Sequence, residues 1–129
     1  MSAAAGAAVR AGVLARLRAV GGTNGVWEGA GVSAATPFLL LGDVDAREWG
    51  TKDAAGAELR VLVTVRDRGD TPARAGALAV AVEAAVAGLP RVLGEWRVAS
   101  VVLVRSRVVS AGKGAWAAMV DHRVRVLAG

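Results

Sequence analysis

Two segments of this chain alternate apolar and polar residues with a period of two, and this pattern restricts the fold more than any other feature. In the first segment, apart from Leu62, the apolar residues Leu59, Val61, Val63 and Val65 alternate with Glu58, Arg60, Thr64 and Arg66. In the second, Trp116, Ala118, Val120, Val124 and Val126 alternate with Met119, Asp121, Arg123 and Arg125. Successive side chains of a strand point to opposite faces of a sheet. The pattern therefore predicts two strands, each with one buried and one solvated face.

Two further segments are predicted as strands. Pro37 precedes a short apolar run at residues 38–41, which favours a buried strand over roughly residues 37–48. Residues 92–110 are rich in β-branched side chains and are predicted as a third strand in chain order. Turns rich in glycine follow both segments, at residues 50–56 and 111–114. The four predicted strands therefore form two hairpins.

Two amphipathic helices are predicted beside these strands. In the first, over residues 3–20, the apolar residues recur at three- and four-residue steps, and Gly21 and Gly22 end the helix. Asp70, Thr71 and Pro72 start the second helix, and Gly88 with Pro90 ends it. Residues 23–36 show no periodicity and are predicted as a surface loop. The order α-β-β-α-β-β predicts one α+β domain over residues 1–129, in which two helices pack on a mostly antiparallel sheet of about four strands.

Length and composition restrict the class of protein. The 129 residues suit a single domain, and the absence of cysteine excludes disulfides and thiolate metal sites. No apolar run is long enough to cross a bilayer, so we expect no membrane partner. Arg10, Arg16 and Arg18 interrupt the alanine-rich start, where a secretory signal needs an unbroken apolar stretch. The sequence thus predicts synthesis in the cytoplasm.

The chain offers little material for a catalytic site. His122 is the only histidine, and its position in the alternating pattern places it among core residues, so a structural role is favoured over that of a base. A single histidine without cysteine also excludes a histidine-rich metal site. Asp43 and Asp45 are two residues apart on a predicted strand, a spacing typical of a solvated face. We therefore predict no catalytic residues, no cofactor and no metal ligands.

The polar faces of the last two predicted strands carry five arginines: Arg97, Arg105, Arg107, Arg123 and Arg125. They can form a basic strip that contacts DNA phosphates, or an ordinary solvated face paired with acids such as Glu95 and Asp121. No aromatic residue lies between them to stack on bases, so both interpretations stay open. Trp96 and Trp116 fit core positions, whereas Trp27 and Trp49 lie in or beside predicted loops. Trp49 can anchor a contact between subunits or pack locally, and we favour the contact between subunits.

Several segments, taken in order, resemble one known family. They are the Pro-aromatic strand at residues 37–42, the Trp-Gly-Thr-Lys turn at residues 49–52, the Gly-Ala-Glu sequence at residues 56–58, the alanine-rich helix at residues 74–86, and a closing strand rich in arginine and valine. Together they are similar to the tail completion, or tail terminator, proteins of long-tailed phages, prophages and gene transfer agents. Phe38 stands where relatives often have tyrosine, and the glycine at position 50 is a minor departure.

The resemblance implies a structural, non-enzymatic role at the head end of a tail. Such a protein forms a homohexameric ring that caps the tail tube, stops its polymerisation and joins it to the head-tail connector or stopper protein, with DNA passing through the lumen. It is made in the bacterial cytoplasm and resides in the phage-like particle. We expect the subunit or tube interface at Trp49, Thr51, Lys52 and Glu58, and the five arginines at the lumen or an interface.

Two other functions remain open on the residues alone. A head-side stopper or neck ring protein shares this size and architecture and differs only in its position in the particle. A DNA-binding regulator could use the arginines, although no recognition helix is predicted. A small hydrolase is disfavoured, because the chain has no cysteine and its one histidine is predicted to be structural. No nucleophile is therefore paired with a general base.

Overall fold

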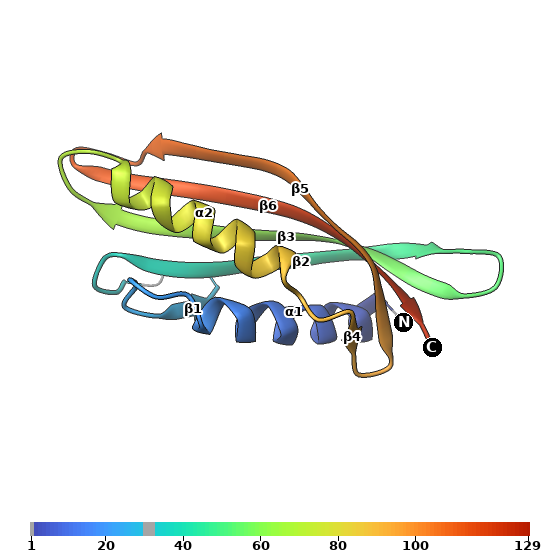
Figure 1. Ribbon diagram of the computed structural model, residues 1–129. Coiled ribbons are helices and arrows are strands. Elements are labelled where there is room, and N and C mark those ends of the chain that lie inside the picture. Colours follow the sequence, from blue (N-terminus) through green and yellow to red (C-terminus); the bar gives the residue numbers. More distant parts are fainter. Residues whose placement is uncertain (1, 30–32) are drawn as a thin grey trace.

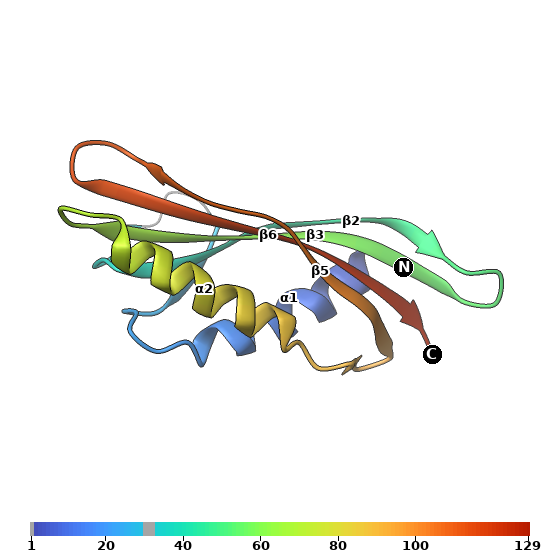
Figure 2. The same cartoon turned by 45° about the horizontal axis from the view of Figure 1, so that its top comes forward.

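The computed structural model describes residues 2–29 and 33–129, in which two helices lie on one face of a long, twisted sheet (Figures 1 and 2). The elements follow in the order α1 (Ser2–Arg18), β1 (Val26–Glu28), β2 (Phe38–Gly50), β3 (Ala55–Arg68), α2 (Ala73–Ala87), β4 (Val92–Leu93), β5 (Trp96–Ser110) and β6 (Ala115–Ala128). An α+β architecture agrees with the sequence prediction. The composition of the sheet does not.

In the described part of the chain, the sheet has six strands in the order β1-β2-β3-β6-β5-β4. Neighbouring strands are antiparallel except β1 and β2, which run parallel. The prediction of about four mostly antiparallel strands is therefore wrong, because it omits β1 and β4 and the parallel pair. These strands have three and two residues, too few to show a period of two. Backbone pairing with a longer neighbour places them in the sheet.

The two additional strands lie in segments that were predicted otherwise. β1 belongs to residues 23–36, predicted as a loop, and its end of the sheet is fastened by hydrogen bonds from Asn24 N to Pro37 O and from Leu39 N to Gly25 O. Residues 92–110, predicted as one strand, are divided into β4 and β5 by a turn. In that turn Gly94 has a φ of +61°, in the left-handed region that favours glycine.

β3 and β6 form the centre of the sheet, and their pairing explains the two-residue alternation. Their register aligns Val61 with His122 and Val63 with Val120, so these side chains share one face, which the helices cover. We call it the helix-covered face. The register also aligns Glu58 with Arg125 on the opposite face, which no helix covers and which we call the outer face (Figure 2).

Both helices bury an apolar stripe against the helix-covered face. Val9, Val13 and Leu17 of α1 are fully buried, as are Val82 and Val86 of α2. These residues and the inward side chains of β2, β3, β5 and β6 form one hydrophobic core. Neither helix, within the described residues, is both long and apolar enough to cross a membrane.

The two helices also contact each other. Nε of Arg16 donates a hydrogen bond to the carbonyl oxygen of Ala85, one of the last carbonyls of α2. Gly12 lies so close to the segment after α2 that an added Cβ would meet Leu93 Cδ2 at 2.9 Å. These contacts fix α1 and α2 side by side under the sheet, so the outer face is the sheet surface left for other interactions.

Candidate functional site

The predicted interface residues lie on or near the hairpin between β2 and β3. Trp49 is the penultimate residue of β2, and Glu58 is the fourth residue of β3. Thr51 and Lys52 lie in the turn between the strands, at the end of the molecule where the hairpin projects (Figure 1). The structure brings Trp49 and Glu58 to the outer face but leaves Thr51 and Lys52 at the hairpin tip.

Glu58 lies at the centre of a cluster of arginines, although it was predicted only as part of a hairpin contact. One carboxylate oxygen, Oε2, accepts hydrogen bonds from Arg47 Nη2 at 2.7 Å and from Arg47 Nε at 3.0 Å. The other, Oε1, accepts one from Arg125 Nε at 2.9 Å and lies 4.0 Å from Arg123 Nε. Only 8% of Glu58 is exposed. The two hydrogen bonds from Arg47, and then the one from Arg125, hold the pKa of Glu58 below its ordinary value.

Trp49 joins the same group through Arg125. The guanidinium carbon of Arg125 lies 5.1 Å from the centroid of the Trp49 ring, within the range of a cation–π interaction. We call Arg47, Trp49, Glu58, Arg123 and Arg125 the Glu58 cluster. Its members come from β2, β3 and β6, so it ties three strands together at the base of the hairpin. Sequence reasoning did not find it, because the contacts depend on the register of three strands.

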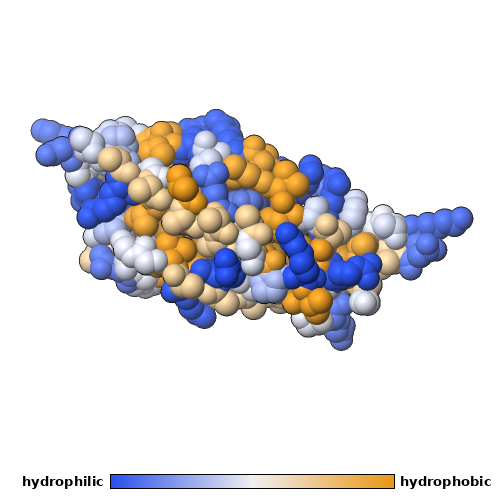
Figure 3. Space-filling view, viewed as in Figure 1, coloured by the Kyte–Doolittle hydropathy of each residue, from blue (hydrophilic) through white to orange (hydrophobic). Residues whose placement is uncertain are grey.

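The hairpin tip has a different character. Thr51, Lys52 and Asp53 are exposed, and Thr51 N and Oγ1 bond to the backbone of Ala54 at 2.9 and 3.2 Å. Figure 3 shows hydrophilic surface at both narrow ends of the molecule, one of which is this tip. The turn thus holds the positive side chain of Lys52 beyond the end of the sheet.

All five arginines of the predicted strip share the outer face. The register aligns Arg97 with Leu127, Arg105 with Asp121 and Arg107 with Met119, all on this face. Arg97, Arg105 and Arg107 are exposed, whereas Arg123 and Arg125 are half-buried beside Glu58. Asp121 is bonded to Arg60, not to Arg105. The strip therefore has a half on β6 whose charge Glu58 partly neutralises, and an exposed half on β5.

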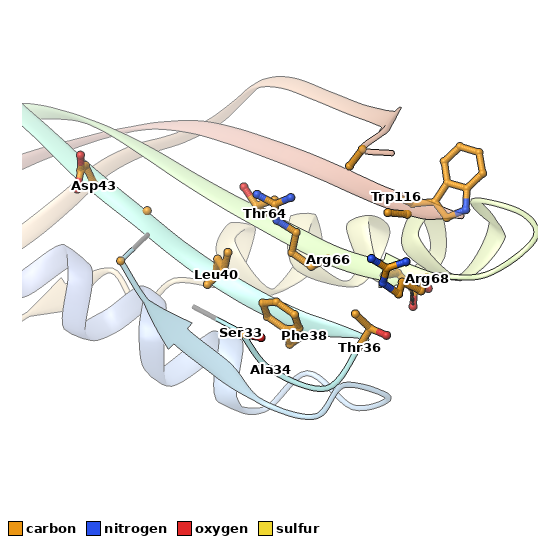
Figure 4. A pocket seen from close by; sticks show the side chains of 15 residues that line it. Ser33, Ala34, Thr36, Phe38, Leu40, Asp43, Thr64, Arg66, Arg68 and Trp116 are labelled. Atoms are coloured by element: carbon orange, nitrogen blue, oxygen red, sulfur yellow. Dashed lines mark hydrogen bonds between the residues drawn. The ribbon is translucent and has the colours of Figure 1, made fainter. Parts of the chain in front are cut away.

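A shallow hollow of about 610 Å³ lies on the outer face beside β1 and the start of β2 (Figure 4). Its lining includes Phe38, Leu40, Thr64, Arg66 and Trp116. Trp27 meets the Phe38 ring edge-on at 5.7 Å between centroids, which stiffens the apolar side of the hollow. It is open and mixed in polarity, unlike the enclosed apolar pockets that usually bind small molecules.

His122 lies on the helix-covered face, as its place in the alternation predicts. It is 2% exposed, and its Nδ1 has no hydrogen-bond partner among the described residues. Burial lowers the pKa of His122, partly offset by nearby Asp121. Within residues 2–29 and 33–129, no three His, Cys, Asp or Glu side chains gather as metal ligands would.

A second buried carboxylate was not anticipated. Asp67, 4% exposed at the end of β3, accepts hydrogen bonds from Arg74 Nε at 2.8 Å and Arg74 Nη2 at 2.6 Å. Arg74 lies in the first turn of α2, and it lowers the pKa of Asp67 chiefly through these bonds. This pair fastens α2 to the sheet and is structural, because Asp67 is enclosed.

Comparisons with known proteins agree with the sequence resemblance. The family model described as "Tail completion protein gp17" matches residues 7–127. A chain in the structure of the "Virion of native gene transfer agent (GTA) particle" has the same fold, with a TM-score of 0.77 and 24% sequence identity over 92% of this chain and 93% of that one. Among curated proteins, no significant match is found.

Proposed function

Because this chain belongs to the tail completion protein gp17 family, we propose that it is a structural subunit at the head end of a phage-like tail. In this role it forms a homohexameric ring that caps the finished tail tube, stops its polymerisation and joins the tube to the head connector. The family match over residues 7–127 carries the proposal. The fold shared with a chain of a gene transfer agent virion supports it.

The shape and chemistry of the outer face agree with a role in binding rather than in catalysis. The one imidazole is enclosed in the core, where a substrate has no access to it. The Glu58 carboxylate accepts hydrogen bonds from Arg47 and Arg125, so it is not a free base. We therefore assign no catalytic step to this chain.

The hairpin tip is our candidate for the contact with the tail tube or with a neighbouring subunit. Lys52 and Thr51 are exposed there, while the Glu58 cluster makes the base of the hairpin rigid. A rigid, projecting hairpin with a charged tip is suited to docking into a fixed partner, because little conformational entropy is lost on binding.

The five arginines of the strip fall into two groups, according to whether their charge is already bound by Glu58. Glu58 already neutralises part of the charge of Arg123 and Arg125, so these two are less available to DNA passing through a lumen. Arg97, Arg105 and Arg107 are exposed and can face either DNA or an acidic surface of a neighbouring subunit.

We predict that replacing Trp49 and Lys52 together with alanine prevents ring or particle assembly and leaves the monomer folded. Trp49 is only half-buried and Lys52 is exposed, so neither belongs to the core. Electron microscopy of particles and circular dichroism of the purified variant measure the two outcomes. Arg18→Ala, at the exposed end of α1 and outside the hairpin, is the control. Normal particles from the double variant would contradict the assignment of the hairpin.

Particle morphology after deletion of the protein separates the tail position from the head-side alternative. Loss of a protein that stops tube growth gives tails of abnormal length. Loss of a head-side stopper instead gives heads that leak DNA. Strongly salt-dependent binding of the isolated protein to duplex DNA would favour the regulator.

A further inference from the structure

β5 leaves most of one sheet edge without a partner. β4 pairs with Trp96 and Arg97, and Val98 N donates a hydrogen bond to Arg91 O, so among the described residues no strand pairs with the outer side of residues 99–110. Four apolar side chains on this stretch are 40 to 45% exposed: Val102, Leu103, Val104 and Val108. Figure 3 shows apolar patches, with hydrophilic surface between them, along the side of the molecule where β5 lies. A long, apolar, open edge is a template for another strand.

β2 leaves the opposite edge of the same sheet open. β1 pairs with Leu39–Leu41, and in the described chain no strand pairs with residues 42–50 on that side. The guanidinium of Arg10 bonds to the carbonyl of Gly42, and α1 packs beneath this edge on the helix-covered face. Within the described residues, each copy therefore has two partly unpaired edges, and they belong to different strands.

The directions of the strands allow the two edges to meet between copies. β2, β3, β6 and β5 alternate in direction, so β2 and β5 run in opposite directions. A copy rotated about an axis along the strands keeps these directions, and its β2 meets the first copy's β5 in an antiparallel pair. β1 and β4 cover only the starts of β2 and β5, at opposite ends of the sheet, so the open stretches overlap.

Charge selects this pairing over the alternatives. Residues 98–110 carry Arg105 and Arg107 on the outer face and no acid. The open stretch of β2 carries Asp43 and Asp45, and both lie on the outer face. Within the described chain, none of these four side chains forms an ion pair. A β5–β5 pair would bring arginines together, which disfavours a two-fold dimer through this edge.

We infer that β5 of one copy pairs with β2 of the next, with Arg105 and Arg107 of the first against Asp43 and Asp45 of the second. Main-chain hydrogen bonds supply much of the binding, and the charges fix which edges meet. The contact joins two different surfaces, so repeated rotation closes it into a ring. This inference rests on the proposed ring and names the surfaces that build it.

Charge exchange tests the pairing. The first variant carries Arg105→Glu and Arg107→Glu, and the second carries Asp43→Arg and Asp45→Arg. We expect native mass spectrometry to show each alone as a monomer and an equimolar mixture as rings, because every contact in an alternating ring then joins opposite charges. The control reverses Arg18 and Asp70, which are exposed and lie at the end of α1 and before α2, outside both edges, and it keeps the ring.

The outcomes separate this inference from the proposed ring. If the wild-type chain forms rings and both charge variants form them too, the edge pairing is overturned and the ring stands. If the variants are folded monomers by circular dichroism but the mixture stays monomeric, the edge pairing is likewise overturned. A wild-type chain that remains monomeric overturns both.

The cysteine-free chain permits a second, independent measurement. With Asp45→Cys and Arg107→Cys in one chain, a short thiol cross-linker should give a ladder of covalent oligomers up to the size of the ring. Cross-linked dimers from Arg107→Cys alone would show that β5 meets β5, and would overturn the inference.

Discussion

Glu58 shows how a single side chain can hold a strand hairpin in place on an open sheet face. Arg47 of β2 and Arg125 of β6 both donate to its carboxylate, and Arg125 also lies over Trp49. Removal of the carboxylate would leave three arginines close together without a counter-charge. We attribute the fixed orientation of the hairpin base to this residue.

At the same scale, stability should fall with acid in two separate pH ranges. Burial lowers the pKa of His122, so the folded state favours the neutral imidazole. The free energy of unfolding therefore falls as the pH drops below about 6.5, the pKa of histidine in the unfolded chain. Arg47 and Arg125 lower the pKa of Glu58, and Arg74 lowers that of Asp67. These two carboxylates contribute to stability fully above about pH 4, the carboxyl pKa in the unfolded chain. The contribution is lost as the pH falls through their lowered pKa values in the folded protein.

Thermal unfolding followed by circular dichroism between pH 8 and 3 measures this dependence. We expect the midpoint temperature to fall first below about pH 6.5 and again below about pH 4. His122→Leu should remove the upper step only, and Glu58→Gln should reduce the lower one only. An unchanged upper step in His122→Leu would show that another group titrates there.

At the scale of elements, the hairpin depends on a close approach at Gly56. A Cβ at this position would lie 2.2 Å from the carbonyl oxygen of Val126 and 2.8 Å from that of Trp49. Neither backbone can move away without breaking the pairing of β3 with its neighbours. We expect Gly56→Ala to lower the free energy of unfolding by about 2 to 3 kcal/mol, measured by urea denaturation.

Gly21→Ala is the matched control, because nothing lies within 4 Å of an added Cβ there. Its free energy of unfolding should change by less than about 0.5 kcal/mol. Equal stability of the two variants would mean that β3 can shift away from β6 at little cost.

The long elements could be predicted from the sequence, and the short ones could not. The alternation around Val63 and Val120 and the apolar spacing around Val13 come from burial of one face, which acts on each residue separately. β1 and β4 are instead defined by backbone pairing with distant segments. For the same reason the sequence placed Glu58 near the hairpin but did not predict the arginines around it, since that requires the register of three strands.

At the scale of the whole molecule, the sheet has the properties that a ring subunit needs. Its two ends carry exposed polar turns at residues 51–54 and 111–114, which suit two different partners along the tail axis. In the part of the chain that the structure describes, its two edges are open over most of β2 and β5 and differ in charge, which suits side-to-side contact between copies. The helices occupy the remaining face and supply the core.

The central claim is that copies of this chain close into a six-membered ring, and native mass spectrometry of the purified wild-type protein tests it most directly. We predict a dominant species of six times the chain mass of 13.0 kDa, seen as closed rings by negative-stain microscopy. A monomer, a two-fold dimer or an open filament as the dominant species would contradict it.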